Sequence, residues 1–430
     1  MPFSTLSLSP ALVRAANALG YVEPTPIQVQ AIPTILKGGD VLGLAQTGSG
    51  KTAAFCLPLL QALQNPTRAS SRSSIKTLIL VPTRELAAQV GDAIHGISQH
   101  LPVAVKTTVV FGGVSINPQM MGLRGGADIV VATPGRLLDL IDHNALNLAN
   151  VSTLVLDEAD RLLDLGFSDE LTRILTLLPP QRQSLFFSAT FDSSVQALAD
   201  ALLRNPARIE IAASPKTTPQ IAQRAIEVDS NRRTQLLRHL IQQHKWPRVL
   251  VFVATKHAAE IVADKLRKAN IWAEPFHGML SQGKRTQVLT DFKGNRVQVV
   301  VATDLAARGL DIAELPVVVN YDLPRSSDDY LHRIGRTARA GEKGVAISFI
   351  SRDTAAHFDL IEKRNAIGLA RERVADFEPA EISDHAPHRA PDGIGNSNSN
   401  NHGNGNGGVK GNRPNKKDKL RAIAAQLAAK

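Results

Sequence analysis

The chain has 430 residues, 43% of them hydrophobic, which is long enough for two or three domains with buried cores. No stretch reaches the roughly 18 consecutive apolar residues of a membrane-spanning helix, and residues 1–20 lack the basic start and apolar run of a signal peptide. A single cysteine, Cys56, excludes an internal disulfide and a multi-cysteine metal site. We therefore expect a cytoplasmic protein with no membrane partner.

The net charge of +10 favours a polyanionic partner, but the charge is unevenly distributed. Residues 386–430 hold 8 basic and 2 acidic side chains, which leaves an excess of only 4 positive charges for the preceding 385 residues. Aromatic residues make up 4% of the chain, too few for a large base-stacking platform. If the body of the protein binds nucleic acid, contacts to the backbone should dominate.

Short runs rich in Val, Ile and Leu alternate along the chain with longer stretches of helical periodicity. Near-continuous apolar strands separated by helices indicate a parallel sheet covered on both faces. Residues 212–220 are polar with two prolines and indicate a linker. The sequence thus predicts two α/β domains, 1–211 and 221–377, of about 200 and about 155 residues and similar order of elements. In chain order, strands are predicted at 77–83, 128–134, 152–160, 184–190, 248–255, 297–304, 316–322 and 344–350, with helices at 84–94, 135–143, 192–203 and 256–269.

Residues 378–430 have the composition of a disordered, basic tail rich in Asn and Gly. Residues 396–408 contain no apolar side chain, so burial cannot offset the entropy of ordering them. The last fifteen residues return to helical composition, with Leu420, Ile423 and Leu427 spaced for one face. A short docking helix and a frayed, solubilising end both fit this pattern.

Residues 40–52, DVLGLAQTGSGKT, combine an apolar strand with a glycine-bearing loop, and a helical stretch follows. This is the context of a phosphate-binding loop, in which backbone N–H groups at a helix N-terminus surround phosphates. Lys51 would reach the β and γ oxygens, and Thr52 would ligate Mg²⁺. Ala45 stands where the general pattern has glycine, and a glycine turn without a ligand is the alternative. The candidate nucleotide contacts of this loop are Gln46, Thr47, Gly48, Ser49, Gly50, Lys51 and Thr52.

Residues 153–160, TLVLDEAD, place carboxylates just past the end of an apolar strand, where ligands bind in doubly wound sheets. Asp157 would hold the metal through water, and Glu158 would orient or deprotonate the attacking water. Alone, such a cluster also fits a helix N-cap with solvated acids. After a phosphate-binding loop, it is typical of the second half of an NTPase site.

Together these motifs resemble the DEAD-box family of ATP-dependent RNA helicases, most closely the bacterial RhlE-type subgroup. The resemblance runs from about Phe3 to Phe377. It rests on Phe3, GYVEPTPIQ (20–28), AQTGSGKT (45–52), PTREL (82–86), GG (112–113), TPGR (133–136), DEAD (157–160), SAT (188–190), ATDLAARGLDI (302–312) and HRIGRTARAG (332–341). It implies two tandem RecA-like domains, the superfamily 2 helicase core, with ATP and Mg²⁺ as cofactors.

The resemblance assigns further residues to the nucleotide. Gln28 matches the residue that binds adenine, which its amide can do because it both donates and accepts. Thr25 belongs to the same element, and Phe3 matches the aromatic residue that stacks on the base; without the resemblance Phe3 would be an ordinary core residue. Asp311 matches the residue that bonds the ribose.

Two groups of motif residues match RNA contacts in the family. Each motif of the first domain follows an apolar strand and on its own also fits a turn with a helix cap. Contacts of this kind, to phosphate and ribose, carry little sequence information. The implied RNA-binding residues are Pro82, Thr83, Arg84, Gly113, Thr133, Gly135 and Arg136 in the first domain, and Gln282, Arg285 and Thr303 in the second.

The second domain lacks a GK[ST] sequence, so it is not a second ATPase. The resemblance makes Arg336 and Arg339 the γ-phosphate contacts supplied from this domain, since guanidinium groups stabilise the charge of phosphoryl transfer. An exposed arginine face that binds RNA directly is the alternative. Ser188 and Thr190 match the residues that couple the carboxylates to the rest of the site, and His332 is assigned to the same coupling role.

The sequence therefore predicts an RNA-dependent ATPase that separates short RNA duplexes or remodels RNA–protein complexes. ATP and RNA would each touch both domains, so either would favour closure and the binding of the other. The expected partner is RNA, bound without sequence preference, with ribosomal or RNA-decay assemblies as family precedents and a monomeric core. A superfamily 2 DNA helicase or translocase and a non-catalytic RNA-binding assembly factor are the alternatives.

Overall fold

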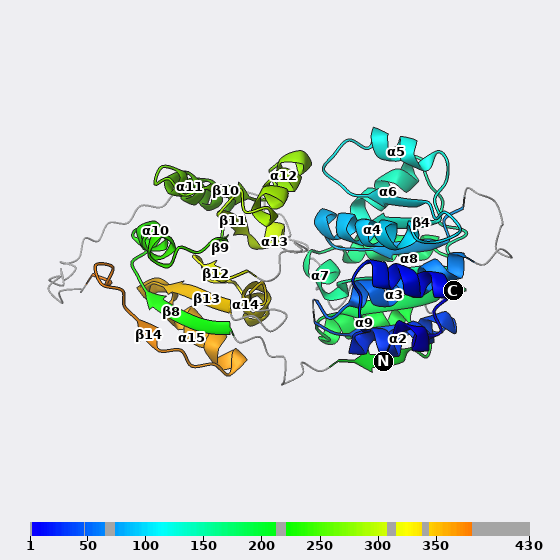
Figure 1. Cartoon of the computed structure of the whole chain (residues 1–430), viewed down its shortest axis with the longest axis horizontal. Helices are drawn as coiled ribbons and strands as arrows, with labels where there is room; N and C mark the ends of the chain where they lie inside the picture. The colour runs from blue at the N-terminus through cyan, green and yellow to red at the C-terminus, as the bar shows by residue number, and fades with distance from the viewer. Residues whose placement is uncertain are drawn as a thin grey trace, which may run out of the picture.

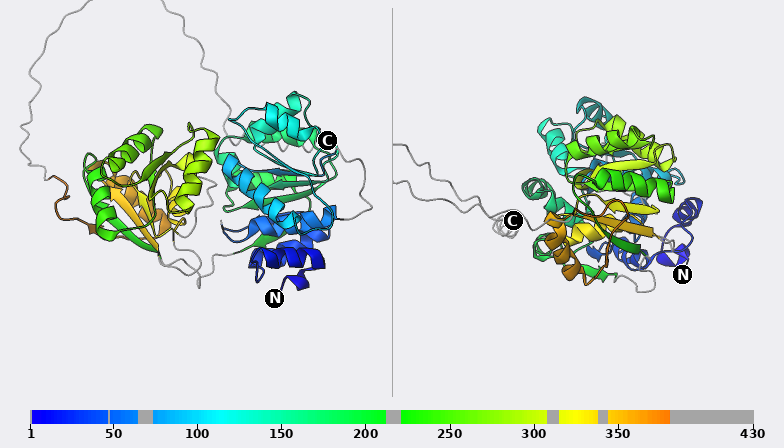
Figure 2. Two further views of the ribbon diagram at one scale, coloured as in Figure 1. Left: turned by 45° about the horizontal axis from the view of Figure 1, so that its top comes forward. Right: turned by 90° about the vertical axis from the view of Figure 1, so that its left-hand side faces the viewer.

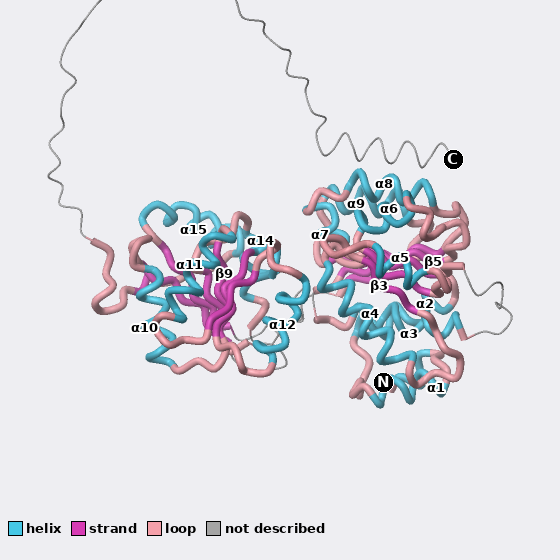
Figure 3. The backbone as a smooth tube through the Cα atoms, turned by 90° about the horizontal axis from the view of Figure 1, so that it is seen from above, coloured by secondary structure: helices cyan, strands magenta, loops and turns pink. Residues whose placement is uncertain are grey.

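The computed structural model describes residues 2–46, 48–64, 74–211, 221–307, 315–337 and 344–380. These residues form two lobes, a first lobe of residues 2–211 and a second lobe of residues 221–380, which lie side by side in Figure 1. The lobes also remain distinct bodies in the left view of Figure 2. In each lobe the strands lie between helices, as the view from above in Figure 3 shows.

The first lobe contains one parallel sheet with the strand order β3-β4-β2-β5-β6-β1-β7. Its elements are η1 (Phe3–Leu6), α1 (Pro10–Ala18), α2 (Pro26–Leu36), β1 (Val41–Leu44), α3 (Lys51–Leu63), β2 (Thr77–Leu80), α4 (Arg84–Ser98), β3 (Thr107–Val110), α5 (Asn117–Leu123), β4 (Ile129–Ala132), α6 (Pro134–Asp142), β5 (Thr153–Leu156), α7 (Ala159–Asp164), α8 (Ser168–Leu177), β6 (Gln183–Ser188), α9 (Ser193–Leu202) and β7 (Ala207–Glu210).

Successive strand residues point to opposite faces of this sheet, and both faces are covered by helices. Val41 packs in a core with residues of α1, α2, α3 and α4, whereas the next residue, Leu42, packs in a second core with residues of α6 to α9. Four of the strands, β1, β2, β4 and β5, are buried at every position. This burial on both faces explains the continuous apolar runs in the sequence.

The second lobe contains a parallel sheet with the order β10-β11-β9-β12-β13-β8-β14, which is the order of the first sheet strand for strand. The predicted pair of similar parallel-sheet domains is therefore confirmed. Its elements are β8 (Ile221–Glu227), α10 (Arg233–His244), β9 (Val249–Val253), α11 (Lys256–Arg267), β10 (Ala273–Phe276), α12 (Gln282–Lys293), β11 (Val299–Thr303), α13 (Asp304–Ala307), β12 (Val317–Asn320), α14 (Ser327–Ile334), β13 (Gly344–Ile350), α15 (Arg352–Asn365) and β14 (Arg371–Glu372).

The domain boundaries expected from the sequence, 1–211 and 221–377, stay a prediction. The described chain continues past Phe377, and the Ala380 N–H donates to Asp229 Oδ2 (3.0 Å). The predicted linker, 212–220, and residues 381–430 of the predicted tail lie outside the described residues. Among the helices that are described, none is long and apolar enough to cross a membrane.

The lobes meet through two pairs of helices: α7 contacts α14 through Arg161 and Asp329, and α4 contacts α12 through Glu85 and Arg285 (Figure 1). The carboxyl ends of the parallel strands in the first lobe carry six of the motifs that the sequence singled out there: AQTGSGKT, PTREL, GG, TPGR, DEAD and SAT. Since β5, β6 and β1 are neighbours, the DEAD, SAT and phosphate-loop residues meet in one half of that edge. Because β3, β4 and β2 form the other half, the GG, TPGR and PTREL residues meet there.

Candidate active site between the lobes

The phosphate-binding loop joins β1 to α3, and Lys51 is the first residue of that helix. The Lys51 side chain is 6% exposed, and its Nζ donates to the carbonyl oxygen of Ala45 (2.8 Å). The Ala45 N–H donates in turn to the carbonyl oxygen of Ser188 at the end of β6 (3.0 Å). The loop is thus tied at its start to the SAT strand, and the ammonium group lies at the N-terminus of a helix, where anions bind.

Gly50 directly precedes α3 and has a φ of +93°, a left-handed conformation that favours glycine. Gln28 Nε2 donates to the Gly50 carbonyl oxygen (3.1 Å), and Gln28 Oε1 accepts from the Thr25 N–H (2.9 Å). A Cβ atom at position 50 would lie 2.5 Å from Gln28 Nε2, so only glycine fits beside this amide. The structure therefore brings Gln28 and Thr25 against the phosphate loop, where the sequence predicted a shared nucleotide site.

Phe3 is buried in the core of the first lobe, whereas a residue that stacks on a base needs an exposed ring face. Its side chain is 2% exposed and belongs to the core formed with α1, α2, α3 and α4. The ring is covered in this conformation, as expected of an ordinary core residue. Its stacking on adenine stays a prediction of the resemblance.

Asp157 follows β5 and is 2% exposed. Burial raises the pKa of this carboxyl to about 6, although the nearby Lys51 ammonium acts in the opposite direction. Glu158 comes next with φ 50° and ψ 51°, a left-handed conformation that costs a non-glycine residue about 1 to 2 kcal/mol. This strained turn begins α7.

Asp160 and Thr190 connect the DEAD residues to the SAT strand. The Thr190 hydroxyl donates to Asp160 Oδ2 (3.1 Å), while Asp160 Oδ1 has no hydrogen-bond partner among the described residues. The buried hydroxyls of Ser49 and Ser188 likewise have no partner among the described residues. Buried polar atoms of native proteins are normally paired, so three such atoms around the loop indicate a polar ligand.

A nucleotide with Mg²⁺ fits this set of side chains. Hard divalent cations take carboxylate and hydroxyl oxygens, which Asp157 and the adjacent Thr52 would supply. A buried carboxylate with a raised pKa gains most from a cation, because burial has removed its water. No group of three or more His, Cys, Asp or Glu side chains suited to a metal occurs in the described ranges.

The other half of the sheet edge is closed by contacts among the three predicted RNA motifs. Thr83 caps α4 by accepting from the Leu86 N–H (3.2 Å), and the Arg84 guanidinium lies so close to Gly113 that a Cβ atom there would overlap it. Gly113 also has a φ of +74°. The second glycine of the GG motif is thus required both by the backbone and by the arginine beside it.

TPGR is joined to the same loop. Thr133 Oγ1 accepts from the Gly112 N–H (3.4 Å), and Arg136 Nη2 donates to the carbonyl oxygen of Val114 (2.7 Å). Arg136 is only 7% exposed, so much of its guanidinium supports the loop. Pro82 is buried, and Gly135 lies in the first turn of α6 with open space where a Cβ would be.

The predicted RNA residues of the second lobe meet the first lobe through a residue that sequence reasoning missed. Arg285 Nη2 lies 2.9 Å from Glu85 Oε1, and the two side chains are 6% and 5% exposed. Gln282 Nε2 donates to the same oxygen (3.4 Å). Glu85 is the acidic residue of PTREL, and its place beside Arg84 in that motif was the available signal. Thr303 ends β11 at the same edge of the second sheet.

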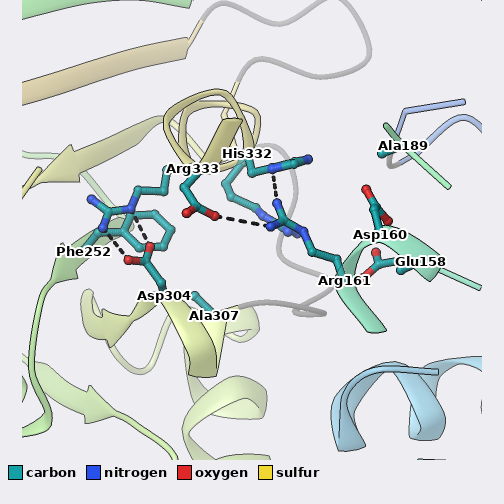
Figure 4. Close-up of a pocket in the computed structure, with 11 residues that line it drawn as sticks. Glu158, Asp160, Arg161, Ala189, Phe252, Asp304, Ala307, His332 and Arg333 are labelled. Carbon is teal, nitrogen blue, oxygen red and sulfur yellow. Dashed lines mark hydrogen bonds and ion pairs between the residues drawn. The ribbon is translucent and has the colours of Figure 1, made fainter. Parts of the chain in front are cut away.

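The arginines of HRIGRTARAG differ in role. Arg333 is 3% exposed and faces its own lobe: Nε and Nη2 bind Asp304 (2.5 and 2.6 Å), and Nη1 donates to Asn320 Oδ1 (3.0 Å). Its guanidinium also lies over the Phe252 ring (4.9 Å). Figure 4 shows this Asp304 pair pointing away from the first lobe. Arg333 therefore anchors α14 to the sheet.

Arg336 and His332 face the first lobe. They line an interlobe cavity with Glu158, Asp160, Arg161 and Asp329 (Figure 4). Burial and then the Arg161 charge lower the pKa of His332 to about 4; Asp160 acts in the opposite direction, and Arg336 adds a smaller lowering effect. His332 is consequently neutral near pH 7. The predicted site residues Thr47, Asp311 and Arg339 lie outside the described residues.

Two parallel-sheet lobes, one with a phosphate-binding loop and one that brings an arginine to the cavity lined by Glu158, define a two-lobe P-loop protein. Residues 25–198 match the family model described as DEAD/DEAH box helicase, and residues 231–341 match the helicase conserved C-terminal domain. The chain is 40% identical over 361 residues to "DEAD-box ATP-dependent RNA helicase CshA" of Bacillus cereus, covering 84% of this chain and 67% of that protein. It is 42% identical to "ATP-dependent rRNA helicase rrp3" of Emericella nidulans, covering 81% of this chain and 74% of that one.

Solved structures agree with these relatives. S. cerevisiae Dbp5 bound to RNA and ADP BeF3 matches with a TM-score of 0.76 and 31% identity, over 87% of this chain and 96% of that chain. Mss116p bound to ssRNA and AMP-PNP matches with a TM-score of 0.76 and 29% identity, over 89% and 79% of the two chains. The chain belongs to the DEAD-box ATP-dependent RNA helicase family. It spans about two thirds of the length of the CshA relatives.

Proposed function

We propose that this protein is an RNA-dependent ATPase that uses ATP hydrolysis to separate short RNA duplexes or to remodel RNA–protein complexes. One observation carries the proposal: the order β5-β6-β1 gathers Lys51, Asp157 and the Thr190–Asp160 pair at one edge, and Arg336 lines the same cavity as Glu158. Family membership supports RNA as the polyanion.

The first lobe would bind the nucleotide and position the attacking water. Lys51 would leave the Ala45 carbonyl to contact the β and γ oxygens, and Gln28 would exchange the Gly50 carbonyl for the adenine edge. Mg²⁺, held by Thr52 and by Asp157 through water, would neutralise charge on the phosphates. Glu158 would orient or deprotonate the water, since its carboxylate faces the interlobe cavity.

The second lobe would complete the site when the lobes meet. Arg336 and Arg339 would stabilise the charge that develops on the γ-phosphate, a contribution of 10³ to 10⁵ in rate for arginines of this kind. Asp311 would bond the ribose. The contacts of Thr190 with Asp160 and of Arg161 with His332 support a coupling path between the SAT strand and α14.

RNA would bind along the other half of the edge, over PTREL, GG and TPGR and the facing α12. Support comes from the bonds that join these loops to one another and from the Glu85–Arg285 pair, which links them to the second lobe. ATP and RNA would then favour the same closed arrangement from two ends of one cleft. The contacts would be to the strand backbone, so the action would be local and without sequence preference.

The finer assignments are part of the same proposal. Residues 7–33 and 249–266 support the RhlE-type subgroup, since these stretches are the most similar to it. A cytoplasmic location, a monomeric core and work on ribosomal or RNA-decay assemblies are proposed from composition and family precedent.

The test compares ATPase rates with RNA and with DNA of identical sequence. We expect stimulation by RNA alone, and equal stimulation by DNA would overturn the proposal in favour of a DNA translocase. Glu158→Gln should lose hydrolysis by about 10²-fold or more while keeping ATP and RNA binding. The matched control is Glu210→Gln, whose side chain is 64% exposed on β7 and should leave the rate unchanged. Normal hydrolysis by Glu158→Gln would show that Glu158 is misassigned.

A further inference from the structure

An arginine to which the motifs assigned no role joins the lobes beside the proposed catalytic residues. Arg161 directly follows the DEAD sequence and lies in α7. Its backbone N–H donates to the Glu158 carbonyl oxygen (2.9 Å), within the strained turn that begins the helix. The backbone of Arg161 is therefore tied to that of Glu158.

The Arg161 guanidinium has one acidic partner in each lobe. Nη1 lies 3.3 Å from Asp164 Oδ2 on its own helix and 3.3 Å from Asp329 Oδ1 on α14. Nη2 contacts Nδ1 of His332, as Figure 4 shows. The Arg161 and Asp329 side chains are 10% and 17% exposed, so water screens their attraction less than that of a surface pair.

The helix that Arg161 contacts is held firmly in its own lobe. Ser326 caps α14 and exchanges hydrogen bonds with Asp329, through the Asp329 N–H (3.1 Å) and through its own hydroxyl to Oδ2 (3.0 Å). Arg333 fixes the other end to Asp304. Arg336 lies two residues past the end of α14, and its N–H donates to the Arg333 carbonyl oxygen (3.2 Å). Moving Asp329 therefore moves Arg336.

We propose that Arg161 is a positioning residue for hydrolysis: it latches α14 onto α7 through Asp329 and so sets Arg336 at the correct distance from Glu158. With the lobes apart, Asp164 still compensates the guanidinium charge; closure adds Asp329 and His332. The contact between Arg161 and Asp329 involves no ligand atom. Its contribution to the free energy of closure therefore adds to the contributions of ATP and RNA. The inference rests on the proposed function, because it gives Arg336 and Glu158 their catalytic roles.

A charge exchange tests the latch. Arg161→Glu and Asp329→Arg are made singly and together, and each protein is assayed for RNA-stimulated ATPase rate and for lobe closure with RNA and AMP-PNP. Closure is followed by energy transfer between dyes on cysteines introduced at Asp169 and Lys268, both exposed. Labelling is selective because Cys56 is fully buried and its pKa is raised by burial.

Each single reversal should lower both kcat and the closed fraction about tenfold, and the double variant should regain at least half of each loss. The Kd for ATP, measured without RNA, should stay within twofold of the wild-type value, since Arg161 is not among the proposed nucleotide contacts. Failure of the double variant to recover, with both single variants impaired, would overturn the latch. So would wild-type behaviour of Arg161→Glu.

Two further variants separate positioning from folding. Asp329→Asn keeps the oxygen that Ser326 binds and removes only the charge, so it should fold, lose part of the closed fraction and leave the thermal midpoint within about 1 °C. Arg173→Glu breaks the exposed pair with Asp142 inside the first lobe and should change neither readout. If Asp329→Asn closes normally, the latch is wrong. If the wild type shows no RNA-stimulated ATPase, the proposed function fails instead.

Discussion

The two lobes share one strand order, but they differ at the start of the helix that follows β1 in the first lobe and β8 in the second. β8 takes the place of β1, and the helix that follows begins with Arg233 where the first lobe has Lys51. Arg233 Nη1 binds Asp322 Oδ1 (2.8 Å), and Nη2 donates to Ser351 Oγ (2.9 Å). Asp322 follows β12, the counterpart of the strand before Asp157. An internal guanidinium thus occupies the region that the first lobe leaves for phosphate.

The difference explains the division of labour between the lobes. In the first lobe, the Asp157 carboxylate after β5 has no ion-pair partner among the described residues. Burial raises its pKa to about 6, although the Lys51 ammonium at the end of the glycine loop acts in the opposite direction. In the second lobe the equivalent carboxylate is satisfied internally. Arg336 of that lobe lines the interlobe cavity together with Glu158, as our proposal for the site of the first lobe requires.

Matched substitutions at the two equivalent positions should have different effects. Lys51→Ala should lower the ATPase rate by about 10² to 10³-fold, because it removes a charge from the phosphates, and should hardly change thermal stability. Arg233→Ala should leave the Kd for ATP within twofold of wild type. It should lower the free energy of unfolding of the second lobe by about 3 kcal/mol, because the Asp322 carboxylate loses its guanidinium partner. ATPase assays and urea unfolding measure both. Loss of ATP binding in a folded Arg233→Ala protein would break the comparison.

Asp157→Asn should stabilise the nucleotide-free protein while abolishing hydrolysis. The pKa of Asp157 is about 6 when folded and 3.8 ordinarily, so the folded state holds the proton more tightly and ionisation destabilises it. At 1.36 kcal/mol for each tenfold change, the gain at pH 8 approaches roughly 3 kcal/mol. The gain should shrink as the pH falls below 6 and vanish below 3.8. Urea unfolding in EDTA at pH 8 and pH 4 measures it, and an equal effect at both would contradict the burial argument.

Acid should open the cleft through His332. Its pKa is about 4 in the closed structure and 6.5 ordinarily, so closure favours the neutral ring. The stabilisation is fully present above pH 6.5 and is lost as the pH falls towards 4, where the ring meets Arg161 and Arg336 as a cation. At pH 5.5 the closure equilibrium should fall about tenfold. His332→Asn should remove this dependence, whereas His257→Asn, exposed on α11, should retain it.

Local sequence predicted the scaffold and the nucleotide half of the site because each depends on short-range rules. Strand burial, the glycine loop before Lys51 and the carboxylates after β5 all follow from residue type and spacing. Even there, the bond from Gln28 to Gly50 was not foreseeable, because it depends on how α2 packs beside the loop.

Contacts between segments far apart in the chain were missed for a physical reason. Glu85 with Arg285, Arg161 with Asp329, and Arg233 with Asp322 join residues whose separation in sequence carries no periodic signal. HRIGRTARAG looked like one basic patch, yet Arg333 is buried and bound to Asp304 of its own lobe, although both Arg333 and Arg336 line the interlobe cavity.

The most direct test of the account measures ATP hydrolysis and RNA binding side by side for Arg336→Ala. The account assigns Arg336 to the γ-phosphate held by the first lobe, so hydrolysis should fall by about 10³-fold while RNA affinity changes by less than about threefold. A variant that loses RNA affinity in proportion to its ATPase rate would place Arg336 on RNA, and would contradict the central claim that the second lobe completes the nucleotide site.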